Sequence, residues 1–437
     1  MVRVGRAGRA EAVIFALLAI GQRLLLRLPY WPVAVAGWWV LVEGVRDRWP
    51  YAFPWGRLAM SQSVAPDVRW VAFGGAPLLT FLVALTSAMA ARYVLTVLSG
   101  RPRSPGSAAA GLAAVVTAGL VLAGGLLPAD PVGGAPTATV AAIQGNVPRA
   151  RNLPQLLNDS QVTQNHVAAT AKLAAAVAAG RLPAPDVVIW PEDSTGLDPR
   201  EYPALSAEIM GAVDTAGKPI LVGEVLHNPQ RNVGQLWVPG VGPAGFYVKR
   251  ELVPFGEYIP FRGIISSFSS LPSLQPINFT PGREPVVFDI GKIRLGDVIC
   301  YEVGFDDLVR SEVNAGANLI ALQSNDADFE LDGQLGETEQ QTAMARIRAI
   351  ESDRTVVYVS TTGESTIISP SGAVIARSGI WRQAILDERV PLVSYRTLAD
   401  RVGAWPEYVL VLVTVLALGF SVVTLRRRSN RPDVSGV

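Results

Sequence analysis

"IRLGDVICYEVGF" (residues 293–305) contains the only cysteine of the 437-residue chain, Cys300. Residues 293–300 form a strand-like run that ends on this cysteine, and Tyr301 and Glu302 follow at once. A lone cysteine that closes an apolar strand is usually a small buried hydrophobic residue. In open α/β sheets, however, reactive groups collect where strands end and loops begin. The stretch therefore poses a choice between a packing residue and a nucleophile.

The sequence around this stretch alternates short β-branched runs with helical segments from residue 137 to residue 400. Such alternation is typical of an α/β domain with a largely buried sheet. The expected strands are 138–144, 186–190, 219–225, 244–250, 293–300, 318–324 and 355–361. The expected helices are 153–179, 202–216, 305–315 and 337–353.

The chain is apolar for a soluble protein of its size, because 49% of its residues are hydrophobic and only 17% are charged. Residues 107–127 carry no charge and have about the length that crosses a ~30 Å hydrocarbon layer as a helix. A further membrane span is predicted at 72–98, and weaker candidates are 30–46 and 11–28. The segment 11–28 is doubtful because it contains two arginines.

The last apolar run, 409–425, is flanked by Trp405 and Tyr408 on one side and by the arginines of 426–428 on the other. Aromatic residues favour the membrane interface, and arginine-rich ends stay on the cytoplasmic side. If these arginines and those of the 99–105 loop are inside, everything between the last two spans faces outward. The arginines before residue 10 fit this topology badly if four early spans cross, so the number of spans stays open.

A Pro- and Gly-rich linker separates the membrane part from the globular part. The predicted parts are 1–128, a transmembrane helical bundle; 129–136, the linker; 137–400, the α/β domain; 404–426, a C-terminal transmembrane helix; and 427–437, a basic cytoplasmic tail. The lipid bilayer is thus an expected partner. The net charge of +1 gives no reason to expect nucleic acid as another.

Three segments place a reactive side chain where a predicted strand ends. "VVIWPEDS" (187–194) puts Glu192 just past a strand, "FYVKR" (246–250) puts Lys249 at a strand end, and Cys300 closes its own strand. Each has a plain structural reading, respectively a helix N-terminal charge, a solvated strand end and a buried small residue. Together they supply a base, a fixed cation and a thiol, and this conjunction favours a catalytic site.

The three residue types fit one kind of chemistry. A free thiol has a pKa of about 8.5 and attacks as the thiolate, so its proton must be taken or its anion stabilised. Glu192 can do the first and Lys249 the second. When the thiolate adds to an acyl carbonyl, the ammonium can stabilise the oxyanion, and Glu192 can pass its proton to the leaving group. Glu257 and Glu302 could hold Lys249 charged and oriented, or position the second substrate.

The chain resembles the nitrilase superfamily in the three segments that carry the Glu-Lys-Cys triad of that superfamily. Along the chain these are "WPED" (190–193), "KRELVPFGEYIPF" (249–261) and "ICYE" (299–302). The wording "LVPFGEYIP" is more specific and is similar to the membrane-bound branch of that superfamily, the apolipoprotein N-acyltransferases. Further matches are "QGNVP" (144–148), "RN" (231–232), "SNDADF" (324–329), "ARIRAIES" (345–352) and "VEGVRDRWPYAFPWGRLAMSQ" (42–62). The likeness covers nearly the whole chain.

The resemblance implies an α/β fold, namely a nitrilase-like αββα sandwich domain inserted between N-terminal transmembrane helices and one C-terminal transmembrane helix. It places this domain on the extracytoplasmic side of the cell membrane. It also implies that the cysteine takes an acyl chain from a phospholipid donor as a thioester. The acyl chain then passes to the α-amino group of the N-terminal diacylglyceryl-cysteine of an apolipoprotein. Glu192 becomes the general base, Lys249 the oxyanion stabiliser and Cys300 the nucleophile.

The same matches assign roles to further residues. Glu257, Glu302 and Tyr301 are expected to support catalysis, and Asn232 and Asn325 to bind substrate. No residue cluster requires a metal or a diffusible cofactor.

Three features depart from the family pattern. The membrane part is short by one or more N-terminal spans. The family usually has an aromatic residue soon after its "GN-P" stretch, whereas Arg149–Asn152 stand here, and Asp328 replaces a bulky aromatic after "SNDA". These departures bear on how lipids enter the site, and the triad is intact.

Two other functions would use the same chain. A membrane-tethered carbon–nitrogen hydrolase would resolve the acyl-enzyme with water, and a lipoprotein-binding scaffold would use no nucleophile at all. The apolar spans and "LVPFGEYIP" favour the acyltransferase over a soluble amidase. The two histidines, His166 and His227, are too few for a histidine-based metal site and are expected to be ordinary surface or packing residues.

Overall fold

The computed structural model describes residues 16, 18–50, 52–99, 105–127, 133–147, 159–267, 275–328 and 335–429. The chain forms two compact units. One unit joins residues 1–128 to residues 402–437, and the other comprises residues 129–401.

The first unit is helical. Its longer helices are α2 (Trp31–Arg46), α3 (Val71–Leu98), α4 (Pro105–Leu122) and α12 (Trp405–Ser429), and its short 3-10 turns are η1 (Leu58–Gln62), η2 (Pro66–Trp70) and η3 (Ala123–Leu126). Within the described residues, three segments are long and apolar enough to cross a membrane, namely Pro66–Leu98, Ala108–Leu126 and Trp405–Thr424. They coincide with the three strongest predicted spans.

The two weaker predicted spans have a different outcome. The segment 30–46 forms α2, but its 16 residues are fewer than the ~20 that a ~30 Å hydrocarbon layer requires. The segment 11–28 lies only partly within the described residues.

Polar contacts fix the helices of the first unit. Glu43 of α2 accepts hydrogen bonds from the Leu58 amide of η1 at 2.7 Å and from Thr80 Oγ1 of α3 at 2.9 Å. Arg48, which follows α2, donates to both carboxylate oxygens of Glu407 in α12, at 2.6 and 2.9 Å. Such two-pronged pairs are directional as well as charged. The last helix of the chain is therefore an integral part of the N-terminal bundle.

The second unit is built on two six-stranded sheets. The first has the order β12 (Ala384–Pro391), β1 (Thr137–Gln144), β2 (Val187–Ile189), β3 (Ile220–Leu226), β4 (Arg231–Val238), β5 (Gly242–Val248). The second has the order β11 (Val374–Arg377), β10 (Thr366–Ile368), β9 (Thr355–Ser360), β8 (Leu319–Ser324), β7 (Ile293–Ile299), β6 (Val287–Ile290). β1, β2 and β3 are parallel, as are β7, β8 and β9, and all other neighbours are antiparallel. Residues that follow the parallel strands of one sheet therefore meet at one edge.

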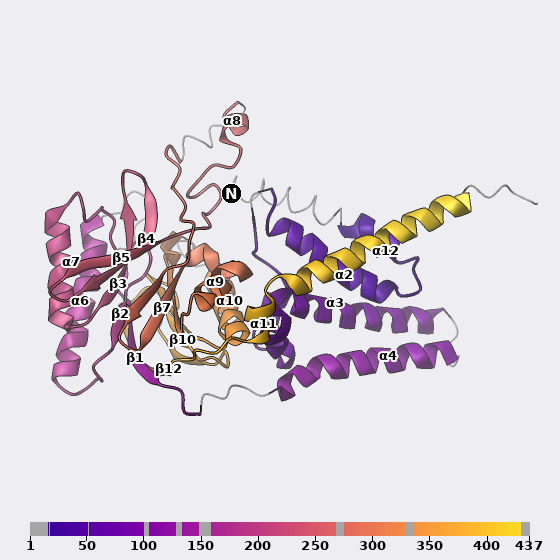
Figure 1. Cartoon of the computed structure of the whole chain (residues 1–437), viewed down its shortest axis with the longest axis horizontal. Helices are drawn as coiled ribbons and strands as arrows, with labels where there is room; N and C mark the ends of the chain where they lie inside the picture. Colours follow the sequence, from indigo (N-terminus) through magenta and orange to yellow (C-terminus); the bar gives the residue numbers. More distant parts are fainter. Residues whose placement is uncertain are drawn as a thin grey trace, which may run out of the picture. The chain divides into compact units, whose positions relative to one another are not determined.

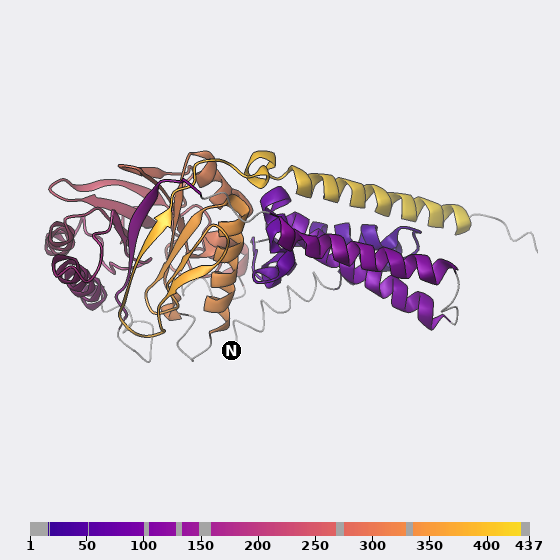
Figure 2. The same cartoon turned by 90° about the horizontal axis from the view of Figure 1, so that it is seen from below.

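Helices cover the outer faces of both sheets (Figure 1). They are α6 (Asp159–Ala178) and α7 (Pro203–Ala216) on the first sheet, and α9 (Asp306–Asn314) and α10 (Gly336–Ser352) on the second. Figure 2 shows the two sheets between these helices from a second direction. On β1, Val140 and Ala142 face the core between the sheets, whereas Ala141 and Ile143 face α6 and α7. Both faces are buried, as in parallel sheets generally. The predicted αββα sandwich is confirmed.

Every predicted strand and helix of the α/β part is present. Residues 153–158, the beginning of the helix predicted at 153–179, lie outside the described residues. The strand predicted at 244–250 is shifted to Gly242–Val248. The prediction missed β4, β6, β10, β11 and β12. β11 and β12 are largely half-exposed, and such strands lack the continuous apolar run that marks a buried one. α8 (Arg262–Ile265) and α11 (Leu398–Val402) are short and were also not predicted.

Candidate active site

Glu192 lies in the turn after β2, and only 4% of its surface is exposed. Its Oε1 accepts hydrogen bonds from Lys249 Nζ at 2.9 Å and from Asn232 Nδ2 at 2.6 Å. Its Oε2 accepts one from the Asn325 amide at 2.9 Å. Three donors on one buried carboxylate satisfy its oxygens and fix its orientation.

Lys249 directly follows β5 and is 1% exposed. Its amide donates to the Asn232 carbonyl at 2.9 Å, which continues the pairing of β4 with β5 by one residue. Its Nζ lies 2.9 Å from Glu192 Oε1 and 3.0 Å from Glu257 Oε1. Burial by itself lowers the pKa of Lys249, but the carboxylates of Glu192 and Glu257 outweigh burial and raise this pKa well above its usual value. Lys249 is therefore a permanent cation.

Cys300 is the residue after β7, not the last residue of that strand as predicted, and it opens the 3-10 turn η5 (Cys300–Gly304). Its φ of 50° lies in the left-handed region. That conformation costs a residue other than glycine on the order of 1–3 kcal/mol. The sequence could not indicate it, because cysteine has no preference for this region. The sharp turn takes the thiol out of the β7 ladder.

The thiol of Cys300 shares its electrostatic environment with the other two predicted residues. Burial raises the pKa of Cys300 well above its usual value, and the Glu192 carboxylate raises it further. The Lys249 ammonium and the Ser324 hydroxyl act in the opposite direction. The resting cysteine is thus a thiol at neutral pH, and a base must remove its proton before it can attack.

Glu257 and Asn232 complete the surroundings of the ion pair. Besides its contact with Lys249, Glu257 accepts a hydrogen bond from the Val253 amide at 2.8 Å through Oε2. Asn232 Nδ2 donates to Glu257 Oε1 at 3.0 Å as well as to Glu192. The expectation that Glu257 could hold Lys249 oriented agrees with this geometry.

Glu302 does not contact Lys249 within the described part of the chain. Its carboxylate instead accepts hydrogen bonds from the amides of Ile299 at 2.8 Å, Arg250 at 2.6 Å and Glu251 at 3.1 Å. The Tyr247 hydroxyl lies 2.9 Å from both carboxylate oxygens and donates its single proton to them. Glu302 therefore joins the strand end that carries Cys300 to the segment that carries Lys249.

Tyr301 and Asn325 lie next to the predicted catalytic residues. The Tyr301 ring packs edge-on against Phe305, with 5.5 Å between ring centroids. Asn325 follows β8. Its side-chain Nδ2 donates to Asp193 Oδ2 at 3.1 Å, and its backbone N–H donates to Glu192 Oε2. Asn232 and Asn325, which were expected to bind substrate, thus hold carboxylates in this structure.

Two features of the site were not predicted from the sequence. One is Asp193, which stands beside Glu192 in "WPED". Behind Cys300, Asp326 accepts hydrogen bonds from Ser324 Oγ and Tyr358 OH, both at 2.6 Å. "SNDADF" contains two of these residues, but no local pattern indicates their link to Tyr358 on β9.

Two of the sequence departures from the family pattern concern residues near the site. Asp328 ends η6 (Asp326–Asp328), and Arg149–Asn152 lie outside the described residues.

Neither histidine belongs to this site. His166 on α6 is fully buried, contacts the Val162 carbonyl at 2.8 Å through Nδ1 and packs against Trp190. Burial lowers the pKa of His166 to about 4, so it is neutral. His227, Asp198 and Glu201 place potential metal ligands within 4.8 Å of one another. Both oxygens of Asp198 already accept hydrogen bonds, so this cluster is explained as a hydrogen-bonded turn.

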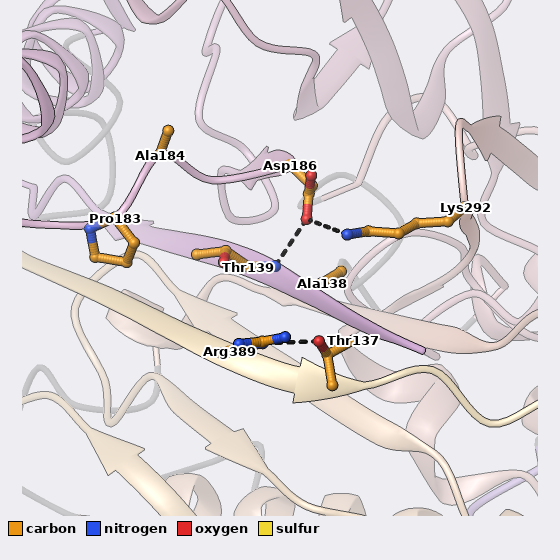
Figure 3. A pocket seen from close by; sticks show the side chains of 8 residues that line it. All are labelled: Thr137, Ala138, Thr139, Pro183, Ala184, Asp186, Lys292 and Arg389. Carbon is orange, nitrogen blue, oxygen red and sulfur yellow. Dashed lines mark hydrogen bonds and ion pairs between the residues drawn. The ribbon is translucent and has the colours of Figure 1, made fainter. Parts of the chain in front are cut away.

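A hollow of about 430 Å³ lies elsewhere on the second unit (Figure 3). It is lined by Thr137, Ala138, Thr139, Pro183, Ala184, Asp186, Lys292 and Arg389. Lys292 points toward Asp186, with Nζ 3.3 Å from its Oδ2 (Figure 3). Thr137, Asp186 and Lys292 stand at the beginnings of β1, β2 and β7, whereas Glu192 and Cys300 follow the ends of their strands. The hollow is therefore not the candidate active site.

Comparisons with known proteins cover both units. The family model for the apolipoprotein N-acyltransferase N-terminal domain matches residues 9–89, and the carbon-nitrogen hydrolase model matches residues 139–405. The apolipoprotein N-acyltransferase of Mycolicibacterium smegmatis is 34% identical over 96% of this chain and 74% of its own length. That of Azotobacter vinelandii is 31% identical over 91% of this chain and 74% of its own length.

Among solved structures, an amidase from Nesterenkonia sp. AN1 matches with a TM-score of 0.43 and 16% sequence identity. The match covers 62% of this chain and 98% of the amidase chain. By the family models and the identity to its relatives, the chain belongs to the apolipoprotein N-acyltransferase family, and its second unit to the carbon-nitrogen hydrolases.

Proposed function

We propose that this chain takes a fatty acyl chain from a phospholipid and transfers it to the α-amino group of the N-terminal diacylglyceryl-cysteine of a lipoprotein. The observation that carries the proposal is the buried ion pair between Lys249 Nζ and Glu192 Oε1, 2.9 Å long, which acts electrostatically on Cys300. A thiol, a base and a fixed ammonium are the groups that acyl transfer through a thioester requires. The names of the relatives supply the acceptor class.

In the first half-reaction, Cys300 gives its proton to Glu192, and the thiolate attacks the ester carbonyl carbon of the phospholipid. Negative charge develops on the carbonyl oxygen, where the Lys249 ammonium stabilises it by about 3–4 kcal/mol. The ester C–O bond then breaks, and the oxygen of the lysophospholipid takes the proton from Glu192. The acyl chain remains on Cys300 as a thioester.

In the second half-reaction, the α-amino nitrogen of the acceptor attacks the thioester carbon. Glu192 takes a proton from that nitrogen and passes it to the sulfur of Cys300 as the C–S bond breaks. The products are the amide and the regenerated thiol. Because Lys249 keeps its charge throughout, the same cation stabilises both oxyanions.

The proposal includes a place in the cell, with the catalytic unit on the extracytoplasmic side of the cell membrane and the chain crossing it several times. Both substrates carry fatty chains, and moving a methylene group from lipid to water costs about 0.8 kcal/mol. An enzyme that is itself anchored by apolar helices such as Trp405–Thr424 avoids most of that cost. The arginines of 426–428 favour a cytoplasmic C-terminus.

Intact-mass analysis of the full chain purified from membranes tests this function. The wild-type chain is expected to carry an acyl adduct on Cys300, and Cys300→Ala is expected to carry none. Adding a diacylated lipopeptide should remove the adduct and give a triacylated product in equal amount.

The same experiment separates the alternatives. Discharge of the adduct as free fatty acid, at a rate that the lipopeptide does not change, would identify a hydrolase. Normal lipoprotein maturation in cells that contain only Cys300→Ala would identify a scaffold. Either result would overturn the proposed acyl transfer.

A further inference from the structure

Asp193 is a carboxylate of the site to which the mechanism above gives no role. It follows Glu192 directly and has a φ of 53°. Asn325 Nδ2 holds its Oδ2 at 3.1 Å. Glu192 and Glu257 are 4% and 9% exposed, whereas Asp193 keeps a larger part of its surface open. Asp193 is thus half-buried, whereas the two other carboxylates near Lys249 are buried.

A charged acceptor must lose one proton more than Glu192 transfers in the second half-reaction. An α-amino group has a pKa of about 8, so much of the acceptor is an ammonium at neutral pH. Its nitrogen must lose one proton before it can attack the thioester and a second one afterwards. Glu192 carries the second proton to the sulfur of Cys300. The first proton can go to solvent water, or faster at neutral pH to a second base that holds the ammonium in the site.

On the basis of the proposed function, we propose that Asp193 is a second base, which binds the ammonium of the acceptor and accepts its first proton. The ammonium and the Asp193 carboxylate become an amine and a carboxylic acid, and the amine nitrogen then attacks the thioester. Asp193 later releases the proton to solvent water. The overall balance is one ammonium and one thioester converted to one amide, one thiol and one proton.

The charges around Asp193 suit this role. The pKa of Asp193 is raised to about 7, mainly by burial and further by the Glu192 and Glu257 carboxylates. The side-chain hydrogen bond from Asn325 and the Lys249 ammonium lower this pKa. These groups belong to the segments after β2, β5 and β8. Two carboxylates and one ammonium leave a net negative charge that attracts an ammonium group. A base is most effective when its pKa is near the working pH.

Asp193→Asn tests the inference, because asparagine keeps the size of the side chain, an acceptor oxygen for Asn325 and a tolerance of left-handed φ. The wild-type chain, this variant and Asp289→Asn are first loaded with the acyl group. Asp289 is an exposed residue of β6 that pairs with Arg294 at 3.5 Å, and it serves as the matched control. Loss of the thioester is then followed with a diacylated lipopeptide and, separately, with hydroxylamine, which is largely uncharged at neutral pH.

Asp193→Asn is expected to load normally and to react with hydroxylamine at the wild-type rate. Its transfer to the lipopeptide at neutral pH should be slower by up to about 10-fold, because only about a tenth of an α-amino group with a pKa of about 8 is uncharged at pH 7. Wild-type transfer should rise as the pH passes about 7, where Asp193 ionises. In the variant the rise should move to about pH 8, where the acceptor loses its proton unaided.

Two results would overturn the role of Asp193. One is a variant that transfers to the lipopeptide with the rate and pH profile of the wild type. The other is an equal slowing with lipopeptide and hydroxylamine, which would make Asp193 a structural residue. A wild-type chain that forms no thioester would instead overturn the proposed function, and the inference with it.

Discussion

At the scale of single residues, the site depends on one charge, the ammonium of Lys249. Glu192 and Glu257 place oxygens 2.9 and 3.0 Å from it, and the Asn232 amide bridges the same two oxygens. Without the ammonium, two buried carboxylates would face each other across that amide. Repulsion between like charges would favour protonation of one of them. A protonated Glu192 could not accept the proton of Cys300.

Lys249→Ala is therefore expected to lose both stability and reaction. Removing one partner of a buried ion pair typically costs about 3–5 kcal/mol, and the thioester should not accumulate. Lys172→Ala, which removes an exposed lysine from α6 of the same unit, should change neither property. Thermal unfolding of the full chain and intact mass measure the two effects. A normal amount of thioester on Lys249→Ala would contradict the proposed role of Lys249 as oxyanion stabiliser.

At the scale of secondary-structure elements, the two sheets approach closely beside the site. A Cβ atom built on Gly234 of β4 would lie 1.8 Å from Asp297 Oδ2 of β7 and 2.6 Å from Gln323 Oε1 of β8. Burial raises the pKa of Asp297 well above its usual value. Gln323 Nε2 donates to the Trp190 carbonyl at 2.5 Å, which connects β8 to the end of β2. The glycine thus lets the sheets meet where their strand ends carry Glu192 and Cys300.

Gly234→Ala is expected to destabilise the second unit by about 1–3 kcal/mol, because the added methyl group overfills a packed interior. Gly211→Ala on α7 is the matched control, since nothing lies within 4 Å of its added Cβ. There the alanine should stabilise the helix by about 0.5–1 kcal/mol. Thermal unfolding of both variants measures the two opposite shifts. Equal shifts would show that the approach of β4 to β7 is not tight.

The sequence predicted the parts of this unit that depend on local patterns. Glu192, Lys249 and Cys300 were proposed because each stands at or next to a predicted strand end, and in the structure all three are buried and influence one another electrostatically. The contacts of Glu302 were not predictable, since its partners are backbone amides of Ile299, Arg250 and Glu251 that only the folded chain brings together. The strands that were not predicted, β4, β6, β10, β11 and β12, all pair antiparallel with a neighbour, and this pairing rather than an apolar run defines them.

At the scale of the whole molecule, the first and last helices belong to one bundle although the catalytic unit separates them in sequence. Arg48 and Glu407 are 359 residues apart and form a two-pronged pair. Ser421 Oγ of α12 also donates to the Leu24 carbonyl at 2.9 Å. The catalytic unit is therefore an insertion between helices that pack together. In the proposed topology both of its ends leave the membrane on the same side.

The proposed topology predicts which residues a membrane-impermeant maleimide can reach in right-side-out vesicles. The chain has one cysteine, so Cys300→Ala removes all background labelling. Ser371→Cys would place a thiol in the exposed turn between β10 and β11, and Ser99→Cys in the exposed end of α3. Ser371→Cys should react at once, because the catalytic unit faces outward. Ser99→Cys should react only after permeabilisation, because the 99–105 loop carries two arginines that favour the cytoplasm. Labelling in the opposite order would invert the orientation and place the site on the cytoplasmic side.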